Sequence, residues 1–389
     1  MQNTCRLERI PFRLTPECAL DSFSGRIFCG KPVSTPDQVR GRHFPENALS
    51  VAIVAAAAAI TCVSAAQAQQ HTVRVAVVRA LTSTPLMIAD QKGYYKDLGI
   101  KVEVSDIDTT ALVPLAQNQV QVMEAGMTAG YFNALEKDFP ITIASDRAAT
   151  PILHKLLIRP DLKDRIRKIA DLKGKTIAVN GTASVVNYEL GKLLETVGLT
   201  IKDVELKVLP FPQMGVGLAN KAVDAAVVIP PWAFQLVDQN IGTVLVDVDD
   251  HVKPTPLSIA VAFINTDWAR QNRELARNFF VAYIRGVREY CQAYHNGPNR
   301  QDVIDIAVRT GVERRPELLY KYPWPSRDPN GQFNMASLLD IQSWYVKAGL
   351  SQQQFAPERI ATSEYVNYAV QKLGPFTVEN KDSTLPGCR

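Results

Sequence analysis

The chain has 389 residues, a formal net charge of +4, and 46% hydrophobic against 21% charged residues. This length exceeds the usual size of one domain and this composition is typical of soluble globular proteins, so we expect two domains, and the composition disfavours extended disorder and an integral membrane protein. The basic residues form no clustered stripe of the kind that phosphate-backbone binding requires, and we expect no nucleic-acid partner.

Residues 39–68 have the pattern of an export signal. An apolar run from Leu49 to Val63 follows Arg40 and Arg42 and ends in a small-x-small sequence at 66–68. This pattern predicts a secretory signal peptide over 39–68, with cleavage after Ala68 and a periplasmic mature protein. The run is shorter than the about 20 apolar residues of a membrane span. We interpret 1–38, which precedes the signal, as an extension from a misplaced start codon.

The cysteines leave two questions open. A lipoprotein would have to use Cys62, but Ile60 and Thr61 ahead of it lack the usual small residue, so we favour the cleaved signal. Cleavage after Ala68 leaves Cys291 and Cys388 in the mature chain. They could form a disulfide in an oxidising compartment, but the sequence does not show whether their Cα atoms come close enough.

After the signal, short β-branched runs alternate with helical patterns, which is typical of βαβ units. The first series runs to about residue 147, and its expected strands are Val73–Val78, Val102–Val104, Val120–Val122 and Ile141–Ala144. A second series repeats this order over about 176–228, and the chain from Glu274 onward is mainly helical.

The two series predict an α/β fold with two lobes, each a mainly parallel sheet flanked by helices, and a ligand cleft between them. We expect lobe I to contain 69–157 and 256–389, including the helical C-terminal region, and lobe II to contain 158–255. The lobes should hinge at the crossings near Leu156–Ile158 and Val252–Leu257.

Pro85–Val102 reads PLMIADQKGYYKDLGIKV, and the segments Asp171–Val179 and Asn220–Ala226 follow it in order. In these segments the chain resembles the ABC-type nitrate, sulfonate and taurine binding proteins, a group that includes the thiamine-pyrimidine precursor binders. The resemblance covers about Val73–Ile264. It departs at Ile229–Trp232, where relatives usually carry Trp-Glu-Pro, so a contact made by that acid does not carry over.

The resemblance implies the periplasmic-binding-protein type II fold and a solute-binding component of an ABC importer. Such a protein captures a small ligand by hinge closure, works as a monomer, and delivers the ligand to a permease and its ATPase in the inner membrane. A ligand-sensing subunit for a membrane signalling receptor is an alternative that the sequence does not separate from import.

The candidate ligand contacts lie in turns between strand ends and helices, where free backbone N–H groups and the helix dipole favour an anion such as a sulfonate or carboxylate. Arg147 offers a planar fork for such a group, and an aromatic residue could supply an apolar wall. Helix capping and a surface Asp-Arg pair explain several of these residues equally well. The predicted contacts are Thr82, Ser83, Thr84, Gly126, Thr128, Ala129, Asp146, Arg147, Gly181, Thr182, Ala183, Ser184 and Trp232, with Phe211 and Tyr188 as weaker aromatic candidates.

Nothing in the sequence favours an enzyme. The five histidines lack metal-ligand spacing, and no nucleophile elbow, Walker loop or dinucleotide fingerprint is present. A pyrimidine synthase of thiamine biosynthesis uses a related fold but needs a cysteine cluster that the mature chain lacks. We therefore expect a non-enzymatic protein without cofactor or metal.

Overall fold

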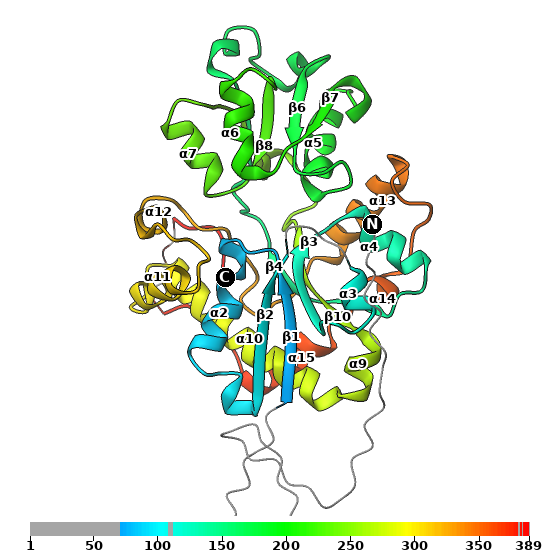
Figure 1. The fold of residues 1–389 in the computed structure, drawn as a ribbon, viewed down its shortest axis with the longest axis vertical. Helices are drawn as coiled ribbons and strands as arrows, with labels where there is room; N and C mark the ends of the chain where they lie inside the picture. The colour runs from blue at the N-terminus through cyan, green and yellow to red at the C-terminus, as the bar shows by residue number, and fades with distance from the viewer. Residues whose placement is uncertain (1–70, 108–111, 380–381, 383, 389) are drawn as a thin grey trace, which may run out of the picture. The chain divides into compact units, whose positions relative to one another are not determined.

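Two five-stranded sheets form the framework of the computed structural model, which describes residues 71–107, 112–379, 382 and 384–388 (Figure 1). The first sheet has the order β2-β1-β3-β10-β4 and the second the order β7-β6-β8-β5-β9. We call the parts built on them lobe I and lobe II. The strands are β1 (His71–Val77), β2 (Ile100–Asp106), β3 (Val122–Gly126), β4 (Ile141–Ala148), β5 (Lys155–Ile158), β6 (Thr176–Val179), β7 (Glu205–Val208), β8 (Ala225–Val228), β9 (Thr243–Asp247) and β10 (Ala260–Asn265).

Both sheets follow one plan, as the repeated series predicts. β1 pairs in parallel with β2 and β3, and β6 pairs in parallel with β7 and β8. The fourth position of each sheet is an antiparallel strand, β10 in lobe I and β5 in lobe II, and in each case the chain has just crossed from the other lobe. The prediction of two lobes with mainly parallel sheets is therefore confirmed.

The first crossing lies earlier than the predicted hinge at Leu156–Ile158. All of β5 belongs to the second sheet, because Lys155 already pairs with Val228 and Asp247. The crossings are thus the segments 149–154 and 252–259, which lead into β5 and β10 respectively. The apolar run at 156–158 reads as a connection in the sequence but is a buried central strand. The predicted lobe boundaries otherwise stay a prediction.

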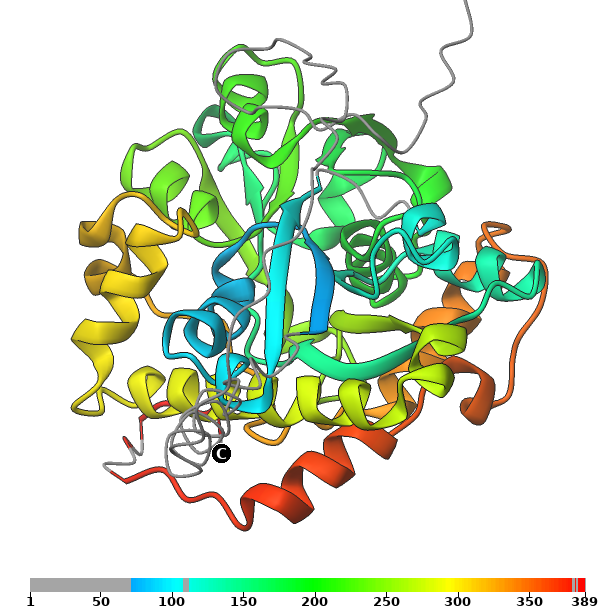
Figure 2. The same ribbon diagram turned by 60° about the horizontal axis from the view of Figure 1, so that its bottom comes forward.

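Helices cover the sheets and make up most of the C-terminal region (Figure 2). The longest helix, α10, is amphipathic and packs against α2 and α15. A Cβ at Gly286 would lie 2.2 Å from the Pro85 carbonyl oxygen, so only glycine permits this close approach to α2. The α-helices are α2 (Thr84–Gln91), α3 (Val113–Ala116), α4 (Ala129–Glu136), α5 (Val185–Glu195), α6 (Phe211–Ala219), α7 (Trp232–Asp238), α8 (Val248–His251), α9 (Thr266–Gln271), α10 (Arg273–Tyr294), α11 (Arg300–Arg309), α12 (Pro316–Lys321), α13 (Met335–Lys347), α14 (Pro357–Ile360) and α15 (Glu364–Leu373). Short 3-10 helices lie at Leu81–Ser83, Lys96–Leu98, Pro160–Leu162, Ile169–Leu172 and Ile201–Asp203.

A disulfide joins Cys291 in α10 to Cys388, with Cα atoms 5.1 Å apart. The Cys388 N–H also donates to Ser326 Oγ at 2.8 Å, so the last described residues are fixed to lobe I by covalent and polar contacts. This resolves the pairing that the sequence left open. The predicted extension 1–38, the signal peptide 39–68 and Cys62 lie outside the described residues. Within the described part of the chain, no helix is long and apolar enough to span a membrane.

Candidate functional site

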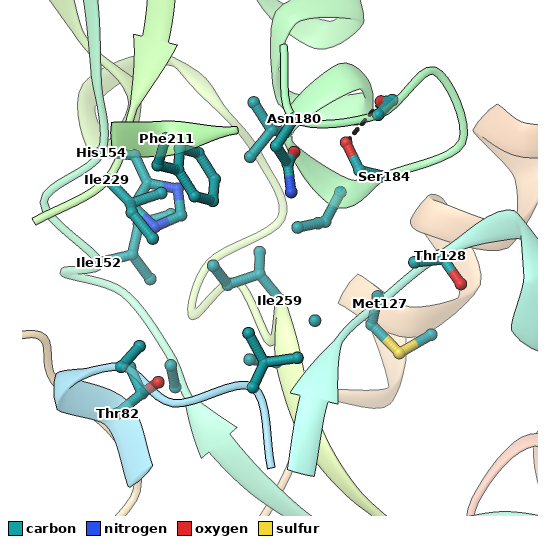
Figure 3. Close-up of a pocket in the computed structure, with 18 of the residues that line it drawn as sticks. Thr82, Met127, Thr128, Ile152, His154, Asn180, Ser184, Phe211, Ile229 and Ile259 are labelled. Carbon is teal, nitrogen blue, oxygen red and sulfur yellow. Dashed lines mark hydrogen bonds between the residues drawn. The ribbon is translucent and has the colours of Figure 1, made fainter. Parts of the chain in front are cut away.

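A cavity of about 490 Å³ lies between the two lobes (Figure 3). Its walls come from the segments that follow the carboxyl ends of β1, β3, β6 and β8, together with the end of β4 and both crossings. This is the edge of open α/β sheets at which ligands bind, and the volume is that of a small-molecule site.

Most of the predicted contacts are brought together around this cavity. The residues that line it are Thr82, Gly126, Thr128, Arg147, Gly181, Thr182, Ala183 and Ser184. They come from both lobes, and the turn 181–184 leads into α5, which begins at Val185 with Ser184 as its N-cap. The positive end of the α5 dipole therefore faces the cavity. That these residues contact a ligand stays a prediction.

The other predicted contacts lie elsewhere for identifiable reasons. The hydroxyls of Ser83 and Thr84 are buried and donate to the carbonyls of Ala80 and Leu81, each at 2.7 Å, so they stabilise their own turn. The Ala129 N–H donates to the Ala183 carbonyl at 3.0 Å and so joins the two lobes.

Trp232 lines a smaller neighbouring cavity and stacks on Phe211 with ring centroids 5.9 Å apart. Phe211 itself lines the main cavity, whereas Tyr188 is fully buried and donates to Asp340 Oδ2 at 2.7 Å. The aromatic wall is therefore formed by Phe211, with Trp232 behind it.

Asp146 is buried within lobe I beside Arg147 in β4. Neither of its carboxylate oxygens has a hydrogen-bond partner among the described residues. Burial raises the pKa of Asp146 to about 8, against the opposing effect of the nearby Arg327 guanidinium. Asp146 is thus a buried acid of the lobe I core and does not line the cavity.

Arg147 reaches the cavity, but its guanidinium is engaged inside lobe I. Nη2 donates to the Val78 carbonyl at 2.5 Å, and Nε lies 3.6 Å from Glu124 Oε2. Glu124 in turn accepts a hydrogen bond of 2.6 Å from the Tyr283 hydroxyl. Burial raises the pKa of the Glu124 carboxyl and lowers that of Arg147. This arrangement uses one of the five Arg147 N–H groups to hold the turn after β1, and it pairs the charge of the guanidinium with Glu124.

His154 was not predicted and is the second ionisable side chain on the cavity wall. Its Nδ1 lies 3.1 and 3.0 Å from the two carboxylate oxygens of Glu189 in α5, which is fully buried. The two residues are 35 positions apart, so no local spacing reveals the pair. Asn180 adds an amide to the wall, and the rest is mainly apolar, with Met127, Ile152, Phe211, Ile229 and Ile259 (Figure 3).

The lobes touch on both sides of the cavity. On one side, Trp344 of α13 packs against α5, and Asp340 of α13 accepts hydrogen bonds from Tyr188 and from Lys192 at 3.0 Å. On the other, Phe234 of α7 stacks on Tyr322, with ring centroids 5.0 Å apart. The C-terminal region therefore holds lobe II at two places.

A family model described as the NMT1-like family matches residues 66–308, which is more than half of the chain. The protein belongs to the NMT1-like family. Its fold is that of the type II periplasmic binding proteins, and the family suspected from the sequence motifs is confirmed. No protein in the curated collection of sequences matches significantly.

Solved structures with the fold of this NMT1-like chain include the periplasmic aliphatic sulphonate binding protein of Escherichia coli, at 15% identity and a TM-score of 0.60, covering 76% of this chain and 99% of that one. The periplasmic nitrate-binding protein of Synechocystis has 15% identity and a TM-score of 0.60, covering 78% and 89%. A desulfurization enzyme also shares the fold, at 15% identity and a TM-score of 0.55, covering 78% and 100%. The NMT1-like fold thus hosts both binding proteins and an enzyme.

Proposed function

We propose that this protein is the periplasmic solute-binding component of an ABC importer. It acts as a monomer, captures a small organic anion between its lobes, and delivers it to an inner-membrane permease and its ATPase. The observation that carries the proposal is the predominantly apolar cavity at the strand ends of both lobes, into which the α5 N-terminus points. Membership of the NMT1-like family and the periplasmic binding proteins among its structural neighbours support it.

Closure would proceed by rotation of lobe II about the crossings 149–154 and 252–259. A ligand that contacts Thr82 or Gly126 from lobe I and the turn 181–184 from lobe II stabilises the closed form, because it binds both lobes only when they approach. The Cys291–Cys388 disulfide supports a location in an oxidising compartment such as the periplasm.

The desulfurization enzyme in the comparisons makes catalysis the competing function. Against it, no cysteine lines the cavity, and both described cysteines, Cys291 and Cys388, are joined in the disulfide. The hydroxyl of Ser184 donates to the Gly181 carbonyl at 2.7 Å and caps α5, so it is not paired with a base. The site therefore favours binding over covalent catalysis.

The test is to purify the exported protein without denaturation and to identify any retained small molecule by native mass spectrometry. We expect a retained organic anion, a smaller radius of gyration by X-ray scattering when it is bound than after its removal, and loss of its uptake in cells that lack the gene. Uptake that persists while a sensor kinase response is lost would favour the signalling subunit. Chemical conversion of the molecule by the purified protein would favour an enzyme, and failure to bind any small molecule would refute the proposal.

A further inference from the structure

We infer that His154, held by Glu189, is the specificity residue of the cavity, and that it selects ligands carrying a hydroxyl group in addition to their anionic group. The inference rests on the proposed function, because it concerns the same cavity. It deepens that function by naming the ligand class as hydroxylated organic acids with an apolar, ring-sized body.

The first step is the fixed position of His154. It is the last residue of the first crossing, and its backbone carbonyl accepts a hydrogen bond of 3.0 Å from Val248 N–H. The two residues before it, Ile152 and Leu153, donate their N–H groups to the carboxylate of Asp249 at 2.9 and 2.8 Å. The crossing is therefore tied to α8, and the imidazole enters the cavity from a restrained backbone.

The second step is the orientation of the ring. Nδ1 lies within hydrogen-bond distance of both Glu189 oxygens, so this ring nitrogen is taken up by Glu189. The side chain lines the cavity, and its hydrogen bonds to described residues are made through Nδ1. A ring nitrogen donates or accepts according to whether it carries a proton, and a hydroxyl can pair with it in either case. Glu189 thus orients the ring and leaves Nε2 for a hydroxyl of the ligand.

The third step is the contrast between two parts of the cavity wall. The turn 181–184 presents N–H groups at the start of α5, which suit an anionic oxygen. In Figure 3, His154, Phe211 and Ile229 are drawn together on one wall, so the imidazole lies beside apolar side chains. A hydroxyl that enters this part of the cavity without a partner would lose its hydrogen bonds to water, and Nε2 can supply the partner.

The fourth step is charge. Among the described residues that line the cavity, Arg147 and His154 are the ionisable ones, and each is paired with a buried carboxylate, Glu124 and Glu189. These pairs leave no unmatched cationic side chain among the described lining residues, so an anionic group is left to the α5 N-terminus. A monoanion with a neutral hydroxyl fits this balance better than a dianion.

The experiment compares 4-hydroxybenzoate with benzoate by isothermal titration calorimetry on the mature protein. The two probes differ only in the hydroxyl, and we expect the hydroxylated one to bind about tenfold more tightly, the effect of one hydrogen bond of about 1.4 kcal/mol. Because His154→Phe alone would leave the Glu189 carboxylate buried and unpaired, the test variant is His154→Phe/Glu189→Met, which removes both groups at similar volume.

In this variant the preference should disappear while benzoate affinity stays within about threefold. The control is Asp161→Asn, which removes an exposed acid paired with Arg159 at 3.0 Å in the same lobe and should keep the full preference. Equal affinity of the wild type for both probes, a preference that survives in the double variant, or no binding of either probe would each overturn the inference. The proposed function is tested separately: if neither probe binds but the purified protein retains another small molecule, the inference fails and the proposed function still stands.

Discussion

Two basic side chains on the cavity wall, Arg147 and His154, are each bound to a buried carboxylate, but they differ in role. The Arg147–Glu124 pair of lobe I is buried, and its guanidinium also donates to the Val78 carbonyl, so it braces the protein itself. In the His154–Glu189 pair, one ring nitrogen binds the carboxylate and the other remains open to the cavity. A buried charge is thus no guide to ligand binding by itself; what matters is how many of its donors and acceptors the fold has already used.

The two lobes also differ in how firmly their own contacts hold them together. The α10, α11 and α15 helices cover lobe I, and the disulfide closes this layer on itself. Lobe I also buries several charged side chains, among them Glu124, Asp146 and Arg147. No disulfide occurs in the described part of lobe II, which contacts the C-terminal region mainly through α5 and α7. We therefore expect lobe I to dominate the stability of the protein and its dependence on redox state and pH.

Removing the disulfide should have the largest effect. Replacing both Cys291 and Cys388 by Ala opens a loop of 97 residues, which in the chain-entropy description lowers the free energy of unfolding by about 4.7 kcal/mol. Urea denaturation measures this loss, and hydrogen exchange should accelerate in α10 and α15 more than in β6 and β8. The wild type treated with a reductant should behave like the variant. Equal acceleration in both sheets would contradict the assignment of the effect to lobe I.

A second prediction concerns the pH dependence of lobe I. The pKa of Asp146 is about 8 in the folded protein against 3.8 ordinarily, so between these values the folded state holds a proton that the unfolded chain releases. The free energy of unfolding should therefore fall as pH rises from about 4 to about 8, by at most about 1.4 kcal/mol per pH unit from this residue.

The measurement is urea denaturation at several values from pH 5 to pH 8, for the wild type and for Asp146→Asn. The amide cannot ionise, so the variant should gain stability relative to the wild type as pH rises. Glu124, whose pKa is also raised, contributes to both proteins and cancels in the difference. A difference that does not change with pH would show that Asp146 does not retain its proton on folding.

The sequence predicts the framework well and the site only in part. Alternating strand and helix patterns locate the two series, because hydrophobic periodicity and turn residues are local signals. The turns at Gly126 and Gly181 are found for the same reason. The commitment of Arg147 to Glu124 and the pairing of His154 with Glu189 depend on residues 23 and 35 positions apart, which only tertiary packing brings together. The sequence does not predict where β5 begins, because a short apolar run such as 156–158 is equally typical of a strand and of a connection between lobes.

The smallest expected effect tests how lobe II is held by the C-terminal region. A Cβ on Gly191 of α5 would lie 2.1 Å from Trp344 Cζ2 of α13, so Gly191→Ala must push the indole or the helix aside. Overpacking of this kind costs about 1–3 kcal/mol, and it should loosen the contact between α5 and α13 while the disulfide side of lobe I is unaffected. Hydrogen exchange of α13 and the radius of gyration would report the change.

Because Trp344→Phe removes the atoms that clash, the double variant should be less destabilised than the sum of the two single variants. Additive effects would mean that this contact does not limit how closely the lobes approach.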